Sequence, residues 1–261
     1  MYHKAKNILP VFLYFLLTLT VMTYAHPHLS YAQDHNGEKP CSAAQRDCLI
    51  DKMITLTAQI ENTAWRDQTY REIAKTLAFD KKFDQAVALI DKIETPDTRA
   101  MTIRGIGMTL AEYENSTEDL ARKFAKLHIK AGEILDPPSQ GIAMTYIAMS
   151  QAFAKNYEGA WATCEKIKNT ALRNKAYAET AEIQAEYGDF EPARKSINLI
   201  ESTAFRNKAF EIISKILANN RHYEQSLKAA MSIANTYKQT QAIQYILDQQ
   251  KPRERVRTLK P

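Results

Sequence analysis

The chain has 261 residues, of which 45% are hydrophobic and 25% charged, a balance typical of a globular protein and not of a disordered or fibrous one. Its 7 glycines and 9 prolines are few for the tight turns of an all-β protein, and its 3 cysteines exclude a small disulfide-stapled scaffold. The formal net charge is +5, and it falls to +3 without Lys4 and Lys6. Residues 251–261 carry five bases and one acid, a charge of +4, so the rest of the chain has a net charge of −1. We therefore expect no nucleic-acid partner.

Residues 1–32 are predicted to be a cleavable secretory signal peptide. A basic start precedes an apolar run over residues 8–22, which is at the lower edge of the length that spans a bilayer. Small-x-small cleavage sites end at Ala25 and Ala32, and we favour the second because Pro27 breaks the helix upstream of it. The expected location is therefore periplasmic or secreted, with an uncleaved membrane anchor as the alternative.

Residues 33–49 are expected to form an N-terminal segment or cap that holds Cys41 and Cys48. If a helix capped by Ser42 continues through Cys48, the two cysteines lie roughly 10 Å apart. A disulfide allows about 7 Å between Cα atoms, so a bridge requires Cys41 to fold back from an irregular segment. Two alternatives stay open, a disulfide that staples the cap and an unbridged pair. Redox catalysis is not expected, because the spacing is not C-x-x-C.

A repeat of 33 residues organises the chain from about residue 50 to residue 250. Residues 169–181 align without gaps with residues 202–214, and extending the same offset gives six repeats. One repeat carries eight extra residues near 113–120. We call the residue that marks each repeat its anchor; the six anchors are Arg66, Arg99, Gln140, Arg173, Arg206 and Gln239.

A longer helix is predicted to begin just before each anchor. Four residues upstream of the anchors stand residues that cap helix N-termini well: Asn62, Thr95, Asp136, Asn169, Ser202 and Asn235. Apolar residues recur four and seven positions after the anchors, and alanine recurs twelve positions after five of them, which is a helical period. A shorter helix is predicted upstream, from a large apolar residue sixteen positions before each anchor to an isoleucine six positions before it. The large apolar residues are Ile50, Phe83, Phe124, Tyr157, Phe190 and Tyr223, and the isoleucines are Ile60, Ile93, Ile134, Ile167, Ile200 and Ile233.

This pattern resembles the tetratricopeptide/HEAT-like class of αα helical repeats over about residues 50–250. The resemblance is one of architecture, since the tetratricopeptide signature residues and the ankyrin T-P-L-H motif are both missing from the sequence. It implies an all-α fold, a right-handed α-solenoid of stacked helical hairpins in which neighbouring repeats bury a continuous core. Residues 251–261 would follow this solenoid as a basic tail.

The four arginine anchors have two interpretations. They present a ladder of guanidinium groups to an acidic ligand, or each stem packs between helices while its head pairs with a neighbouring carboxylate or loop carbonyl. We favour the second interpretation, because a residue that recurs at one repeat position usually maintains the repeat.

The eight extra residues are expected to form an inserted loop. Its region gathers the acidic residues Glu112, Glu114, Glu118 and Asp119, which we take as a candidate binding surface. A solvated acidic face without a ligand is the alternative, and acid–base catalysis by these carboxylates is not expected from a loop.

No cofactor, metal site or catalytic residue is expected. Gly105 and Gly107 lack the third glycine of a dinucleotide-binding motif, and neither a phosphate-binding loop nor a nucleophile elbow is present in the sequence. Cys164 and His128 occupy repeat positions that are apolar in other repeats, so we expect both to be packed in the core. Copper binding by an N-terminus that begins at residue 26 is not expected either, since Pro27 lacks the required amide N–H.

The sequence therefore favours an exported, non-catalytic helical-repeat protein that acts as a protein- or peptide-binding scaffold in the cell envelope. An envelope polysaccharide-acting hydrolase or accessory factor is one alternative, and a self-assembling structural protein is another. The basic tail 251–261 is expected either to make weak contact with an anionic envelope surface or to be a disordered solubilising end.

Overall fold

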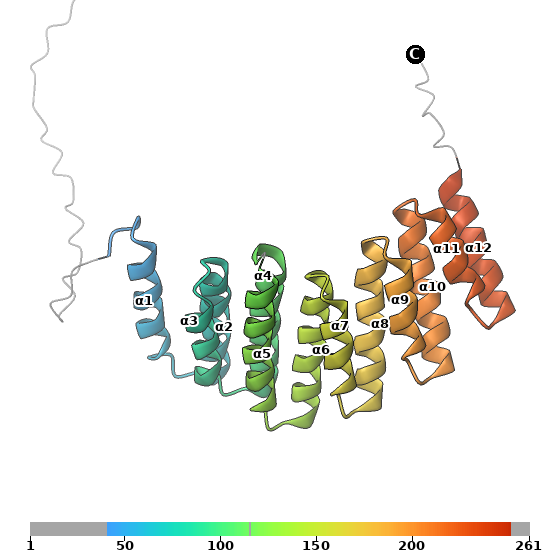
Figure 1. Cartoon of the computed structure of the whole chain (residues 1–261). Coiled ribbons are helices and arrows are strands. Elements are labelled where there is room, and N and C mark those ends of the chain that lie inside the picture. Colours follow the sequence, from blue (N-terminus) through green and yellow to red (C-terminus); the bar gives the residue numbers. More distant parts are fainter. Residues whose placement is uncertain (1–40, 115, 252–261) are drawn as a thin grey trace, which may run out of the picture. The chain divides into compact units, whose positions relative to one another are not determined.

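The computed structural model of the protein describes residues 41–114 and 116–251, and Figure 1 shows their helices in chain order. Within these ranges regular structure is entirely helical, with twelve α-helices, one short 3-10 helix and no β-strand. All the helices belong to one compact unit that begins at Ser42. The predicted signal peptide 1–32, and with it residues 26–28, lies outside the described residues, as does the basic tail beyond Lys251.

Six long helices begin at the predicted positions. Their bounds are α2 Thr63–Phe79, α4 Pro96–Tyr113, α6 Pro137–Phe153, α8 Thr170–Glu186, α10 Thr203–Asn219 and α12 Thr236–Gln250. The six predicted capping residues are the N-caps of these helices, and five of them accept a hydrogen bond from a first-turn N–H. Thr95 is the exception, because its side chain makes no cap hydrogen bond. Pro96 and Pro137 occupy the first helical position, where proline is best tolerated.

The shorter helices alternate with the long ones. Their bounds are α1 Arg46–Thr57, α3 Phe83–Ala88 with the 3-10 helix η1 Leu89–Lys92, α5 Thr117–Gly132, α7 Tyr157–Glu165, α9 Phe190–Asn198 and α11 Tyr223–Met231. Helices α3, α7, α9 and α11 begin at the predicted aromatic residue. The prediction that each runs to the following isoleucine was wrong, because the chain must turn before the next long helix. Ile93, for example, is in an extended conformation after η1 and is fully buried.

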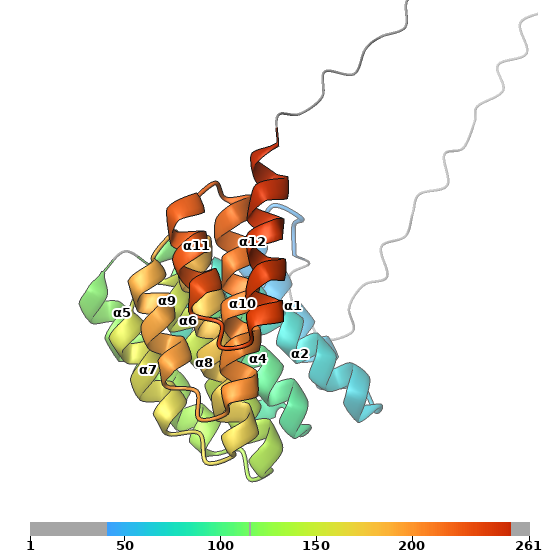
Figure 2. The same cartoon turned by 90° about the vertical axis from the view of Figure 1, so that its right-hand side faces the viewer.

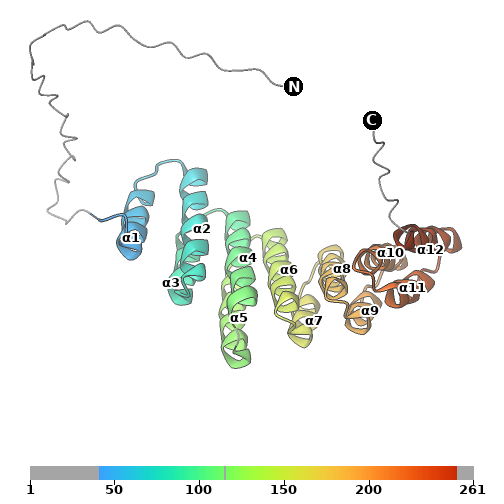
Figure 3. The ribbon, with the colours of Figure 1, turned by 90° about the horizontal axis from the view of Figure 1, so that it is seen from above.

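Figure 3 shows two rows, with the long helices on one side and α3, α5, α7, α9 and α11 on the other. Each long helix contacts the next long helix, from α2 to α12, and α1 packs against α2. The shorter helices pack against the long helices that flank them in sequence. Figure 2 views these helices after a quarter turn about the vertical axis of Figure 1. These contacts between neighbours are consistent with a helical repeat.

The apolar core follows the predicted repeat positions. The residues seven positions after the anchors are all buried, namely Ile73, Ile106, Ile147, Thr180, Ile213 and Ile246. The core divides into two main clusters that meet within α6, one running from Ile50 to Ile147 and the other from Ala148 to Ile246. Met144 packs against both clusters and links them.

Residues 117–120 of the insertion region form the first turn of helix α5, and not the expected loop. Helix α5 begins at Thr117, seven residues before Phe124, the position where four other short helices begin. Ser116 caps this helix by accepting a hydrogen bond from the N–H of Asp119 at 3.2 Å. Glu118 and Asp119 lie in the first turn of α5, where negative side chains interact favourably with the helix dipole. Helical propensity and this cap explain why the segment adds turns to a helix.

Within the described ranges, no helix combines the length and the apolar character that a bilayer crossing would need.

Candidate functional site

The anchor residues hold the turn that precedes their own helix. The guanidinium of each arginine donates to the carbonyl oxygen of the isoleucine six positions upstream, at 3.3 Å for Arg66, 2.6 Å for Arg99, 2.8 Å for Arg173 and 2.6 Å for Arg206. Gln140 donates to Ile134 O in the same way at 3.2 Å. Arg66 and Arg173 also pair with Glu94 and Glu201 of the next repeat. The interpretation that these arginines pack and pair within the protein is therefore confirmed.

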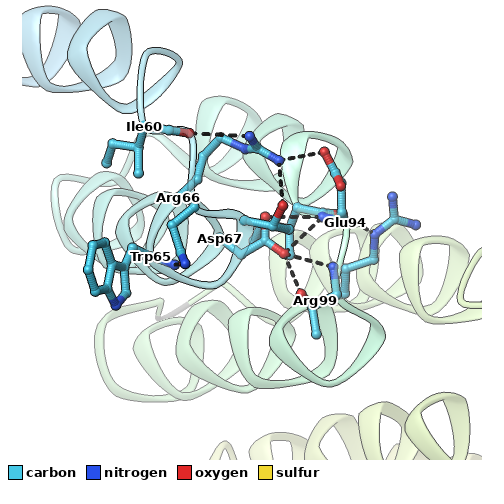
Figure 4. Close-up of polar contacts among 10 residues, drawn as sticks. Ile60, Trp65, Arg66, Asp67, Glu94 and Arg99 are labelled. Carbon is cyan, nitrogen blue, oxygen red and sulfur yellow. Dashed lines mark hydrogen bonds and ion pairs between the residues drawn. The ribbon is translucent and has the colours of Figure 1, made fainter.

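A second connection between repeats involves the residue after the anchor (Figure 4). Asp67 is fully buried, and its carboxylate accepts from the N–H and the hydroxyl of Thr95 at 2.7 Å and 2.6 Å. It also accepts from the N–H of Glu94 at 3.1 Å. Asn174 and Asn207 occupy the same repeat position and accept from the N–H groups of Glu201 and Ala234. The sequence analysis missed this connection, although an Asp or Asn directly after three arginine anchors was the available clue.

The four acidic residues of the insertion region have different positions and partners, and their binding role stays a prediction. Glu112 lies in the last turn of α4, whereas Glu114 follows that helix and pairs with Lys123. Asp119 pairs with Arg122 at 2.8 Å, and Glu118 is exposed in the first turn of α5. Of the four, only Glu112 lines the hollow described below.

The cysteines fall into two environments. Cys41 and Cys48 are both disulfide-bonded, and Cys41 precedes α1, outside any helix. Cys164 is a free, fully buried thiol, and burial raises its pKa to about 12. The prediction that Cys164 packs in the core is confirmed, and the raised pKa keeps it an unreactive thiol at neutral pH.

His128 belongs to a polar network beneath the row of short helices. Its Nε2 lies 3.0 Å from Thr163 Oγ1, and that hydroxyl donates to Gln151 Oε1 at 2.6 Å. One repeat later, the Trp161 Nε1–H donates to Ser196 Oγ at 2.6 Å. Burial, assisted by the nearby charge of Lys166, lowers the pKa of His128 to about 4. His128 is therefore a packed, neutral histidine, and no cluster of metal-ligating side chains occurs among residues 41–114 and 116–251.

A hollow of about 600 Å³ opens on the exposed face of the long helices. Its lining comes from α2, α4, the end of α6 and the residue after α8; Arg71, Lys75, Arg104, Met108, Phe153 and Tyr187 are among these residues. The stem of Lys75 lies across Gly105, where an added Cβ would stand 2.7 Å from Lys75 Cγ. Gly105 thus has a packing role in α4, where it leaves space for a hollow-lining lysine.

Positive charge and apolar surface are combined in this hollow. Arg71 and Lys75 share the carboxylate of Glu72, at 2.9 Å in each case. The guanidinium of Arg104 lies over the ring of Tyr146, 5.2 Å from its centroid. Met108, Phe153 and Tyr187 supply apolar atoms beside these cations. Methionine and aromatic side chains next to fixed charges suit a ligand that is partly apolar and partly anionic.

No protein-family model matches the chain, and no curated protein matches it. Among solved structures, the crystal structure of Ton1535 from Thermococcus onnurineus NA1 is similar to 79% of this chain, over 86% of its own length. The two chains are 14% identical and the TM-score is 0.24, a value at which the likeness carries no argument about fold or function.

Proposed function

We propose that the protein is an exported, non-catalytic scaffold that binds a protein or peptide on the face of its long helices. In this proposal the repeats form a right-handed α-solenoid of stacked hairpins, similar to the tetratricopeptide/HEAT-like class, and the protein acts in the periplasm or outside the cell. Solenoids of this kind offer long surfaces that suit extended partners. The single observation that carries the proposal is the open, mixed-polarity hollow across α2, α4, α6 and the end of α8.

The hydrolase alternative has less support. It would need two close carboxylates with raised pKa values inside a deep pocket. Burial and the neighbouring charges of Glu179 and Glu186 do raise the pKa of Glu182, but these residues lie on α8 outside the lining of the hollow. Glu112 is the one acidic residue among those that line it.

Self-assembly through the last helix also has less support. Its candidate residues were Tyr245 and Leu247 on α12. Tyr245 donates its hydroxyl to Asn219 Oδ1 at 2.8 Å and is partly buried, so Leu247 alone of this pair is exposed. The exposed residues beside it are Gln244 and Asp248, which suit the polar outer face of a capping repeat.

A photo-crosslinking amino acid placed at Met108 tests the proposal in the cells that export the protein. We expect an adduct with a second protein or a peptide, and its loss when Arg71 and Arg104 are both changed to glutamate. The matched control carries the same crosslinker at Ile129, an exposed apolar position of α5 in the other row. Equal labelling from both positions, or none from Met108, would contradict a binding role for this face.

A further inference from the structure

The exposed face of the long helices carries a charge pattern that changes from repeat to repeat. Nine positions after the anchors stand Lys75, Met108, Met149, Glu182, Lys215 and Asp248, one residue per long helix. These six side chains are exposed or partly exposed, whereas those two positions earlier in the repeat are buried. The row therefore reads basic, apolar, apolar and acidic from α2 to α8.

We propose that this face recognises an extended peptide segment with an acidic residue at one end, a basic residue about nine residues away and apolar residues between them. The proposal rests on the binding role proposed above and specifies the chemistry of the ligand. Its acidic residue would lie at α2 and α4, and its basic residue at α8.

The cationic end of the face has charge available for a ligand. Arg71 and Lys75 share a single carboxylate, that of Glu72. Arg104 contacts the ring of Tyr146 and pairs with no carboxylate of residues 41–114 and 116–251. Glu112, the acid that lines the hollow, lies two turns beyond Arg104 at the end of α4 and accepts a hydrogen bond from Tyr113. An incoming carboxylate would thus meet three cations beside two acids, Glu72 and Glu112.

The middle of the face is apolar and adaptable. Met108 of α4 and Met149 of α6 occupy neighbouring positions in the row, and the ring of Tyr146 lies one turn before Met149. Methionine adjusts to irregular apolar surfaces, because its unbranched side chain has several rotatable bonds. This segment would accept apolar side chains of varied shape.

The acidic end lies on α8. Glu179, Glu182 and Glu186 are spaced three and four residues apart, so they share one face of the helix. Lys175 is 3.6 Å from Glu179, and Glu186 accepts from the amide of Asn220 at 3.0 Å. One oxygen of Glu179 is buried without a hydrogen-bond partner. A basic side chain on this face would reduce the repulsion among the three carboxylates.

Beyond α8 positive charge is in excess again. Glu211 of α10 lies 2.9 Å from Lys215, 4.0 Å from Lys208 and 3.9 Å from Lys238. The side chain of Glu211 therefore has its partners within the protein, and three lysines share its single charge. The α10 part of the face is cationic, so the acidic stretch that would take a basic residue of the ligand ends at α8.

The spacing of the helices sets the length of the ligand. Packed helices lie about 8–10 Å apart, so the three steps from α2 to α8 cover roughly 27 Å. An extended chain advances about 3.3 Å per residue, so a segment of about nine residues spans that distance.

Fluorescence anisotropy with defined peptides tests the inference on the purified protein. Four labelled peptides share a leucine–alanine spacer. Three of them carry two charged residues nine residues apart: one has an acid and a base, one has two acids and one has two bases. The fourth has an acid and a base only four residues apart. We expect the long acid–base peptide to bind about tenfold more tightly than each of the others. Changing Arg71 and Arg104 to glutamate should shift the preference to the two-base peptide. Changing Glu179 and Glu182 to lysine should shift it to the two-acid peptide.

The matched control reverses two exposed charges on the opposite row, Glu224→Lys with Lys228→Glu on α11, and should leave the preference unchanged. Circular dichroism of each variant checks that it is folded. Equal affinity for the four peptides, or no binding to any of them, would overturn the charge pattern. If the peptides show no such preference but the crosslinker at Met108 still gives a specific adduct, the scaffold role is kept and only the proposed ligand chemistry is wrong. The two proposals can therefore be contradicted independently.

Discussion

The buried carboxylate of Asp67 joins two repeats through backbone groups that would otherwise lack partners. Thr95 is the N-cap of α4 but makes no side-chain cap hydrogen bond, and its hydroxyl instead donates to Asp67. A buried carboxylate is stable only when hydrogen bonds replace its hydration, which the N–H groups of Glu94 and Thr95 help to do. Asn174 and Asn207 make the equivalent connection without charge. In these three repeats the connection therefore requires an acceptor oxygen, and not a negative charge.

His128 gives the fold a dependence on pH that the sequence pattern does not show. Its folded-state pKa is about 4 because burial disfavours the charged ring, against an ordinary value of 6.5. The unfolded chain therefore binds more protons between these values, so stability is complete above about pH 6.5 and falls as the pH drops towards 4.

We predict that this loss amounts to about 1–2 kcal/mol, since the ring is partly exposed and solvent screens part of the effect. Urea unfolding at pH 7.5 and pH 5.0 gives the change in the free energy of unfolding for the wild type and for His128→Leu, and the difference between the two changes measures this loss. Leucine is chosen because Leu227 occupies the same position in the last repeat. The variant should lose less stability than the wild type over this interval. A slope shared by the wild type and His128→Leu would contradict the assignment to His128.

At the residue scale, the sequence predicted the caps, the buried stripes and the packing of the arginine anchors. Each depends on local chemistry that repeats every 33 residues, so six copies expose it. The polar network of His128, Thr163 and Gln151 was not predicted, because it joins residues from three helices through side-chain directions that no spacing reveals.

At the scale of elements, a three-residue turn follows four of the long helices and uses one left-handed residue. These residues lie fifteen positions after the anchors: Lys81, Lys155, Gly188 and Arg221, with φ values of 60°, 56°, 77° and 63°. An L-residue with a side chain pays about 1 kcal/mol in this conformation, whereas glycine does not. The protein thus uses glycine at one turn and tolerates strain at three.

We predict that Arg221→Gly raises the free energy of unfolding by about 0.5–1 kcal/mol. Gly188→Ala should lower it by about 1–2 kcal/mol, because the new Cβ would stand 2.8 Å from the ring of His222 in addition to the strain at φ 77°. Urea unfolding measures both. Lys155 is a poorer choice for this test, since its ammonium lies 4.6 Å from the centroid of the Tyr187 ring and its removal also loses that contact. A destabilised Arg221→Gly would show that the side chain makes contacts worth more than the strain.

The sequence predicted where the elements begin more accurately than what the insertion becomes. A change in the repeat period shows that residues have been added, but not whether they extend a helix or form a loop. The decisive features were the cap at Ser116 and the helical period of Leu120, Phe124 and Leu127, all buried or capping in the structure. Relative to the other repeats, α4 ends one position later and α5 begins seven positions earlier, so most of the added length lies in α5.

On the scale of the whole described molecule, the core has two main clusters that meet in α6 and a small third one of Ala152, Ala160 and Ile183. Neighbouring helices provide the contacts, so each cluster depends on residues close to it in sequence. Such a structure opens in parts, because loss of one cluster leaves most contacts of the other in place.

We predict that Ile106→Ala and Ile213→Ala have effects confined to their own halves. Both isoleucines are fully buried and occupy the same repeat position, and each change should cost about 2–5 kcal/mol locally. Hydrogen exchange read by mass spectrometry should show faster exchange in α2 and α4 for the first variant and in α10 and α12 for the second. Faster exchange throughout the protein in either variant would indicate a single cooperative core and contradict the division.

The hollow on the long-helix face was beyond the sequence analysis. The repeat pattern reveals which positions are buried, and the exposed positions vary from repeat to repeat without an obvious rule. Arg71 and Arg104 occupy the same repeat position, and Lys75 follows four residues after Arg71. This spacing indicates a cluster of cations only when α2 is known to pack against α4. In a repeat protein the residues that select a ligand are those that differ between repeats, whereas a search for periodicity finds only the residues that recur.

The neighbour-to-neighbour packing of the long helices also has a mechanical consequence. A pull applied between α1 and α12 would pass through the helix interfaces in series, so each interface would take the full load and the extensions would add. A small rotation at each interface would then sum to a large change in the distance between the ends, while the contacts inside every repeat stayed intact. The stack would respond to tension as a soft spring, and an extended partner lying along the long helices would stiffen it.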